Sequence, residues 1–247
     1  MAMIKTSNPA LSANTFRLPY AGTGETMTIS GAVNKTGILL ICAVLTSVWS
    51  WNRFTVSPET AVLPLMIGLI GGFIVAIVTV FKKEWAPATA PLYALLEGLV
   101  LGSVSAMYEV RFHGIAMQAV GLTFGTLFAL LLAYRAGVIR ATEKFKLGVV
   151  AATGGIAIFY FAQFVLGFFG IHFSTINGSG GIGIGFSVVV VIVAALNLVL
   201  DFDFIENGAR SGAPKFMEWY AAFGLMVTLV WLYLEMLRLL SKINSRR

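Results

Sequence analysis

The sequence predicts an all-α membrane protein in which seven hydrophobic helices cross the bilayer. Hydrophobic residues make up 58% of the 247-residue chain and charged residues 11%, whereas about a quarter of the residues of a soluble domain are charged. Charges also interrupt the apolar sequence at intervals of about 20 residues, the length that a helix needs to cross a hydrocarbon core. The composition therefore excludes a soluble enzyme, and lipid is the expected solvent.

Seven apolar segments follow one another along the chain. The predicted spans are Thr36–Trp51, Ala61–Phe81, Pro87–Tyr108, Gly114–Tyr134, Leu147–Gly170, Ile182–Asp203 and Phe216–Leu240. Their connections are short and contain Pro, Gly, Asn or charge, which leaves no room for a separate soluble domain. We therefore expect a flexible polar tail over residues 1–34 and a seven-helix transmembrane domain over residues 35–247.

The distribution of Lys and Arg predicts the orientation. With the amino terminus in the cytoplasm, the tail and the alternate connections on its side hold eleven of the seventeen basic residues, as the positive-inside rule requires. Four basic residues toward the carboxy terminus oppose this choice: Arg238, Lys242, Arg246 and Arg247. A last segment that re-enters instead of crossing would place both termini in the cytoplasm, but the run from Phe216 is long enough to span, so seven crossings are favoured.

Other features exclude several functions and assemblies. The net charge of +6 does not indicate nucleic-acid binding, since no basic face is interleaved with stacking aromatics. The single Cys42 rules out an intramolecular disulfide and a thiol cluster. The pairs Gly98/Gly102 and Gly121/Gly125 are G-x-x-x-G motifs, which we interpret as packing within the chain. A monomer or a weak dimer is expected.

The acidic residues within the spans are the candidate functional residues. A charged side chain at bilayer depth costs about 2.5 to 3.5 kcal/mol on insertion scales, so such residues are rarely retained without a role. Glu97 lies in the third span, Asp201 and Asp203 end the sixth, and Glu235 lies in the seventh, with no Lys or Arg deep enough to be an obvious partner. For Asp203, a position at the water interface is the favoured interpretation.

Carboxylates gathered without a fixed cation would share protons or bind a cation. Oxygen ligands suit hard cations such as Ca²⁺, and Asn197, one helical turn before Asp201, adds a neutral oxygen on the same face. The candidate ion pathway therefore comprises Asp201 and Glu235, with Glu97, Asp203 and Asn197 as further members, and Asp201 and Glu235 would bind calcium transiently. No resident cofactor is expected.

Three motifs resemble the Bax inhibitor-1-like (transmembrane Bax inhibitor motif) family, in its bacterial YccA-like branch. They are LDFDFIENG at residues 200–208, LYLE at 232–235 and LEGL at 96–99. The resemblance implies a seven-helix fold with the last helix central, a pH-sensitive Ca²⁺ leak, and an acidic latch between helices six and seven, made here by Asp201 and Glu235. It also implies a bacterial inner membrane. The chain departs from the family pattern with Glu235 in place of the usual Asp and Asp203 in place of a neutral residue.

The latch makes a demand on helix geometry. If the last helix entered the membrane at Met217, Glu235 would lie about 27 Å further along it, on the far side from Asp201. The pair therefore requires residues 214–222 to be an interfacial or cytosolic helical extension, with the crossing beginning later and Glu218 outside the hydrocarbon.

Three functions compete. The leading hypothesis is an ion pathway, most favourable for Ca²⁺, that is closed when Asp201 and Glu235 share a proton and open when both are ionised. The alternative is an interaction protein that modulates a membrane protease or a stress response, with residues 1–30 as its binding segment. An enzyme is disfavoured, because the chain lacks G-x-G-D and H-E-x-x-H motifs and has no histidine within a span.

Overall fold

The computed structural model describes residues 25–170, 176 and 178–246. The described part of the chain holds seven helices long and apolar enough to cross a membrane. They are α1 (Ile29–Val56), α2 (Pro58–Phe81), α3 (Ala86–Arg111), α4 (Ile115–Arg135), α5 (Glu143–Phe168), α7 (Gly181–Arg210) and α8 (Met217–Asn244), with a short 3-10 helix, η2 (Lys83–Trp85), before α3. The prediction of seven spans is confirmed.

Local sequence signals set the helix ends. Thr28 caps α1 by accepting a hydrogen bond from the Gly31 amide, and Thr142 caps α5 through the Phe145 amide. Pro58 begins α2 in the first helical position, where the missing N–H costs nothing. Gly114 links α3 to α4 at φ 80°, a left-handed conformation that favours glycine.

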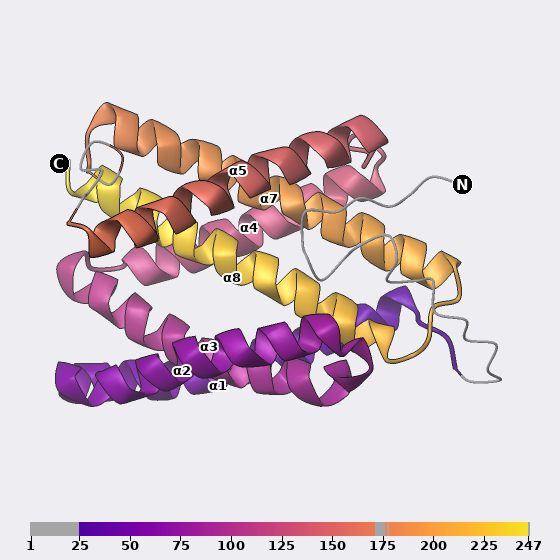
Figure 1. The fold of residues 1–247 in the computed structure, drawn as a ribbon, viewed down its shortest axis with the longest axis horizontal. Coiled ribbons are helices and arrows are strands. Elements are labelled where there is room, and N and C mark those ends of the chain that lie inside the picture. Colours follow the sequence, from indigo (N-terminus) through magenta and orange to yellow (C-terminus); the bar gives the residue numbers. More distant parts are fainter. Residues whose placement is uncertain (1–24, 171–175, 177, 247) are drawn as a thin grey trace.

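Helix α8 is the central element of the bundle (Figure 1), as expected. It packs against α1, α3, α4 and α7. In its most apolar stretch, 61% of the residues are buried inside the protein, compared with 11% for α5. Helix α5 is therefore the most peripheral helix by this measure, and its described contacts with another helix are mainly with α7.

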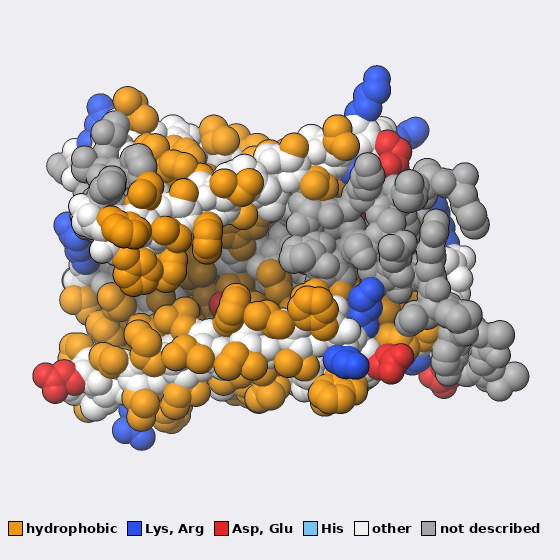
Figure 2. Space-filling view, viewed as in Figure 1, with side chains coloured by type: hydrophobic (Ala, Val, Ile, Leu, Met, Phe, Trp, Pro, Cys, Tyr) orange, Lys and Arg blue, Asp and Glu red, His pale blue; other side chains and the backbone are white. Residues whose placement is uncertain are grey.

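The surface is that of a protein in lipid. Large apolar side chains such as Ile41, Phe73 and Ile158 are 61%, 68% and 71% exposed. Figure 2 shows hydrophobic side chains over the middle of this face, with charged side chains gathered at its two ends. This belt matches what a bilayer requires of a spanning protein.

Two ends of the bundle can be defined by their residues. The basic end contains the beginnings of α1, α3, α5 and α8, with Lys35, Lys83, Lys146 and Lys215. The far end contains the end of α8, with Lys242 and Arg246. Because α8 is one continuous helix of 28 residues that runs from the basic end to the far end, it crosses the bundle and does not re-enter (Figure 1).

The amino-terminal boundary differs from the prediction. The tail was expected to reach residue 34, but α1 begins at Ile29. Just before it, Thr26 pairs with Pro214 in an isolated antiparallel bridge, and the Met27 amide donates to Ala213 O at 2.7 Å. Contacts with the α7–α8 connection order these residues, and no sequence pattern reveals such contacts. The rest of the expected tail, residues 1–24, lies outside the described residues.

The two glycine pairs have different surroundings. A Cβ atom on Gly98 would overlap Ala43 O, and one on Gly102 would overlap Ser47 O, so this pair permits the close approach of α1 and α3. Gly121 and Gly125 have open space where a Cβ would stand. Packing within the chain is therefore confirmed for the first pair and is wrong for the second.

Candidate functional site between the peripheral and central helices

A polar seam fastens α5 to α7 and α8. Along α5, the side chains of Lys146, Thr153 and Tyr160 make polar contacts with these two helices. The three residues are spaced by seven, so they lie on one face of the helix at intervals of about 10.5 Å. We call these residues and their partners Asp203, Asn197 and Glu235 the α5 seam. Three residues that the sequence singled out thus share one interface.

The first contact of the α5 seam is an ion pair near the basic end. Lys146 Nζ lies 2.8 Å from Asp203 Oδ2, and their side chains are 8% and 17% exposed. Glu143, on the first turn of α5, lies 3.6 Å from the same ammonium group. The negative charge of Asp203 is therefore compensated, and Asp203 is not a free oxygen ligand.

The second contact joins neutral side chains in the middle of the seam. Asn197 is 4% exposed, and its amide nitrogen donates to Thr153 Oγ1 and to Val193 O, both at 2.8 Å. Asp201 lies one turn further along α7 and is 2% exposed. Two oxygen-bearing side chains are therefore buried one turn apart on α7.

The third contact surrounds Glu235 of α8, which is 5% exposed. Tyr160 donates its hydroxyl to Glu235 Oε1 at 3.0 Å, and Arg238 donates to the Tyr160 hydroxyl at 2.6 Å and lies 3.5 Å from the same carboxylate oxygen. The other oxygen, Oε2, has no hydrogen-bond partner among the described residues. A buried acceptor in this condition is a position where a bound proton or cation would be stabilised.

The helical register places Asp201 and Glu235 at different depths. Asp201 lies nine residues before Arg210, at the end of α7, and Glu235 lies eighteen residues after Met217, at the beginning of α8. At 1.5 Å per residue, these separations are about 14 Å and about 27 Å from the basic end. The 2.9 Å contact of Lys242 with Ser187 agrees with this register. This register separates the two carboxylates by about 13 Å along the helix axes.

The expectation that no cation lies near the membrane carboxylates is wrong. Lys146 and Lys242 are 6% and 7% exposed, and Arg238 lies beside Glu235. Lys242 donates to Ile176 O, Gly183 O and Ser187 Oγ at 2.8, 3.0 and 2.9 Å, which satisfies its three donors. Lys146, Arg238 and Lys242 lie near helix ends in the sequence. Packing of the long helices against one another buries Lys146 and Lys242 and places Arg238 beside Glu235.

Glu97 lies away from the α5 seam. Its carboxylate packs against Gly72 of α2, where a Cβ atom would stand 3.3 Å from Oε2, and it hydrogen-bonds with Tyr93 one turn earlier on α3. Its described contacts thus belong to the interface between α2 and α3. The described residues contain no group of three or more His, Cys, Asp or Glu side chains that could hold a metal ion.

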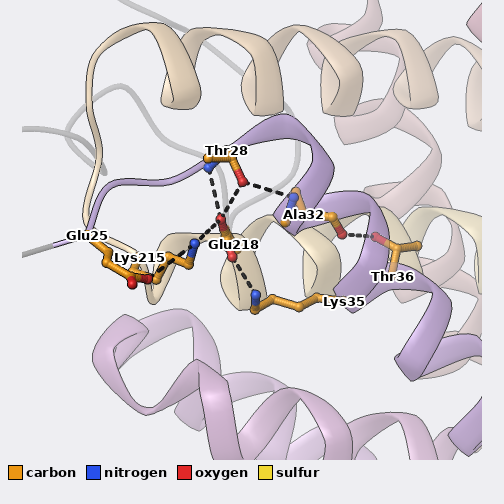
Figure 3. Close-up of polar contacts among 8 residues, drawn as sticks. Glu25, Thr28, Ala32, Lys35, Thr36, Lys215 and Glu218 are labelled. Carbon is orange, nitrogen blue, oxygen red and sulfur yellow. Dashed lines mark hydrogen bonds and ion pairs between the residues drawn. The ribbon is translucent and has the colours of Figure 1, made fainter.

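Sequence reasoning missed the most completely buried carboxylate, Glu218, which was expected outside the hydrocarbon. It is 0% exposed and lies inside the protein at the basic end. Its Oε1 accepts from the Thr28 amide at 2.9 Å and the Thr28 hydroxyl at 2.8 Å, and Lys35 and Lys215 approach as cations (Figure 3). The sequence does not indicate this burial. Lys215 is close to Glu218 along the chain but Lys35 is far from it, and only folding brings the beginnings of α1 and α8 together.

The Glu218 cluster, which comprises Glu25, Thr28, Lys35, Lys215 and Glu218, joins the residues before α1, the first turns of α1 and the beginning of α8. Lys215 also lies 3.5 Å from Glu25, so it pairs with two carboxylates (Figure 3). The hydrogen bond that Lys215 donates to Glu218 and the negative charges of Glu218 and Glu25 raise the pKa of Lys215 above its ordinary value. A Cβ atom on Gly31 would overlap the Glu218 carboxylate, so glycine is required there. The cluster therefore anchors the beginning of α1 to that of α8.

A family model described as Bax inhibitor 1 like matches residues 8–245, nearly the whole chain. No curated protein and no solved structure matches. The match agrees with the three motifs and with the central last helix.

Proposed function

Because the chain belongs to the Bax inhibitor 1 like family, we propose that it forms a pH-sensitive, calcium-permeable leak pathway in the membrane. The observation that carries the proposal is the α5 seam, a row of polar contacts between the most peripheral helix and the two helices that bear buried Asp201 and Glu235. Polar groups that face one another across a helix interface can be hydrated by entering water, whereas an apolar interface offers water no hydrogen-bond partner.

The proposed gate is the charge on Asp201 and Glu235. When both are protonated they are neutral, and the tight packing around them keeps the pathway closed. Loss of the protons leaves one carboxylate charge at Glu235, where Arg238 lies 3.5 Å away, and another at Asp201. Water entering along the α5 seam would stabilise both charges. The open seam then offers the oxygens of Asn197, Asp201 and Glu235, the type of ligand that Ca²⁺ prefers. Calcium is the permeant ion here and not a resident cofactor.

The same charges support a proposed orientation. The basic end carries most of the Lys and Arg residues, so it is placed at the cytoplasmic face of a bacterial inner membrane, with the amino terminus. In this orientation Asp201 is nearer the cytoplasm and Glu235 nearer the opposite face.

The test is Ca²⁺ flux into dye-loaded liposomes that contain the purified protein, across pH 5 to 8. The parent should carry more Ca²⁺ as the pH rises, because ionisation opens the seam. Asp201→Asn and Glu235→Gln should each give low flux with little pH dependence, whereas the matched control Glu84→Gln, an exposed carboxylate, should behave like the parent. Parent flux equal to that of empty liposomes at every pH would contradict the proposal and favour the protease-modulating interaction role.

A further inference from the structure

A groove on the outside of the bundle lies between α1, α4 and α7. It encloses about 1080 Å³. Most of its wall is apolar, and the side chains that matter here are Ile29, Val33, Phe124, Phe128 and Leu131. An apolar groove of this kind at bilayer depth holds an acyl chain more favourably than water.

The groove has a cationic rim at the basic end. Arg135, Arg140 and Arg210 line it there, together with Asp203 and Glu206. Both carboxylates already have cationic partners, since Lys146 lies 2.8 Å from Asp203 and Arg210 lies 2.6 Å from Glu206. Arg135 and Arg140 are exposed, and neither forms an ion pair with a described residue. The rim therefore has two guanidinium groups that no carboxylate of the described residues compensates.

The dimensions of the groove match one leaflet of the bilayer. Its α4 wall runs from Phe124 to Arg135, a length of about 16 Å at 1.5 Å per residue. Half of a hydrocarbon core about 30 Å thick is about 15 Å. A phospholipid with its phosphate at Arg135 would therefore lie with its acyl chain along the whole apolar wall.

We propose that this groove is a binding site for one anionic phospholipid of the leaflet at the basic end. Arg135 and Arg140 bind its phosphate headgroup, since guanidinium groups pair with phosphate through charge-assisted hydrogen bonds. The apolar walls of α1 and α4 receive an acyl chain. Basic pockets between membrane helices bind anionic headgroups by the same combination of charge and apolar surface. The proposal does not depend on the ion pathway.

The test compares binding of phosphatidylglycerol and phosphatidylcholine to the full chain in neutral detergent, by native mass spectrometry. The parent should prefer phosphatidylglycerol. Arg135→Gln with Arg140→Gln should reduce that preference about 25-fold, since each basic residue near an anionic lipid contributes about fivefold. Arg53→Gln with Arg111→Gln, which removes two exposed arginines away from the groove, should leave the preference unchanged.

A second pair of variants tests the acyl-chain part of the site. Gly37 lines the groove with open space where a Cβ would stand, so Gly37→Leu should fill the groove without a clash and weaken lipid binding with the arginines intact. Gly121→Leu adds the same side chain on an open surface outside the groove lining and should not. Equal binding of the two lipids by the parent, or displacement of phosphatidylglycerol by millimolar inorganic phosphate alone, would overturn the proposal.

Discussion

Lys146 of α5 and Asp203 of α7 form an ion pair of 2.8 Å at the basic end of the bundle. Both side chains are largely buried, and the pair begins the row of polar contacts that fastens the peripheral helix. Each partner explains the presence of the other, because a lone charge at this burial would be strongly disfavoured.

The Lys146–Asp203 pair predicts a specific loss of stability. Lys146→Met leaves a largely buried carboxylate without its cation, and we expect it to lower the free energy of unfolding by about 2 kcal/mol. Thermal unfolding in detergent measures the change. Lys144→Met removes an exposed neighbour and should have little effect. If Lys146→Met with Asp203→Asn is no more stable than Lys146→Met alone, unpaired charge is not the cause.

The depths of Asp201 and Glu235 predict that their substitutions act independently. Residues separated by more than about 10 Å usually give additive changes in stability, within about 0.5 kcal/mol. The stability change of Asp201→Asn with Glu235→Gln should therefore equal the sum of the single changes in thermal unfolding at pH 7. A coupling well above that limit would mean that the two carboxylates meet directly, as the resemblance to the family implied.

The α5 seam predicts that tying α5 to α7 closes the pathway. In a chain with Cys42→Ser, a thiol cross-link between Thr153→Cys and Asn197→Cys, whose native side chains touch at 2.8 Å, should reduce Ca²⁺ flux to the level of empty liposomes. Reduction of the bond should restore part of the flux, since this variant lacks the Asn197 oxygen of the proposed pathway.

The matched control for this experiment lies between α1 and α3. Ser50 and Ser103 touch at 2.6 Å in a tightly packed interface, so a cross-link between cysteines at these positions should leave flux unchanged. Undiminished flux through the α5–α7 cross-linked protein would place the pathway elsewhere.

Glu218 predicts a local loosening at the basic end. Glu218→Gln removes the carboxylate charge that pairs with Lys35 and Lys215 and accepts a hydrogen bond from Thr28. We expect this change to lower the free energy of unfolding by about 2 to 3 kcal/mol. Hydrogen exchange at residues 27–35 should accelerate, while that at the middle of α8 should change little.

This loosening should not vary over the pH range of the flux assay. Because the raised pKa of Lys215 favours its charged form in the folded protein, the contribution of Lys215 is fully present below its ordinary pKa of about 10.4 and is lost only as pH rises past the raised value. A change in hydrogen exchange at residues 27–35 that follows the deprotonation of Lys215 between pH 5 and 8 would contradict a raised pKa for this residue.

Gly98 predicts a packing defect. A side chain at this position would overlap Ala43 O and Thr46 Oγ1 of α1, so Gly98→Leu should force α1 and α3 apart and lower stability by about 3 kcal/mol. Gly121→Leu, on an open surface, should unfold like the parent. Thermal unfolding and the yield of monodisperse protein measure the difference, and equal values for the two variants would show that the α1–α3 contact tolerates a side chain.

The sequence alone determined the number of helices, their order and the presence of lipid as solvent. These properties follow from the lengths of apolar runs and from the charges between them, which are local features of the chain. Burial of Asp201 and Glu235 also followed, since each lies within an apolar run.

Only the tertiary structure decided the partners of these residues. Lys146, Arg238 and Lys242 lie near helix ends in the sequence, and the depth of each depends on how far its helix slides against its neighbours. The separation of Asp201 from Glu235 likewise comes from the register of α7 and α8, which distant packing contacts fix. Such contacts join residues far apart in the chain, and no apolar run or local charge pattern encodes them.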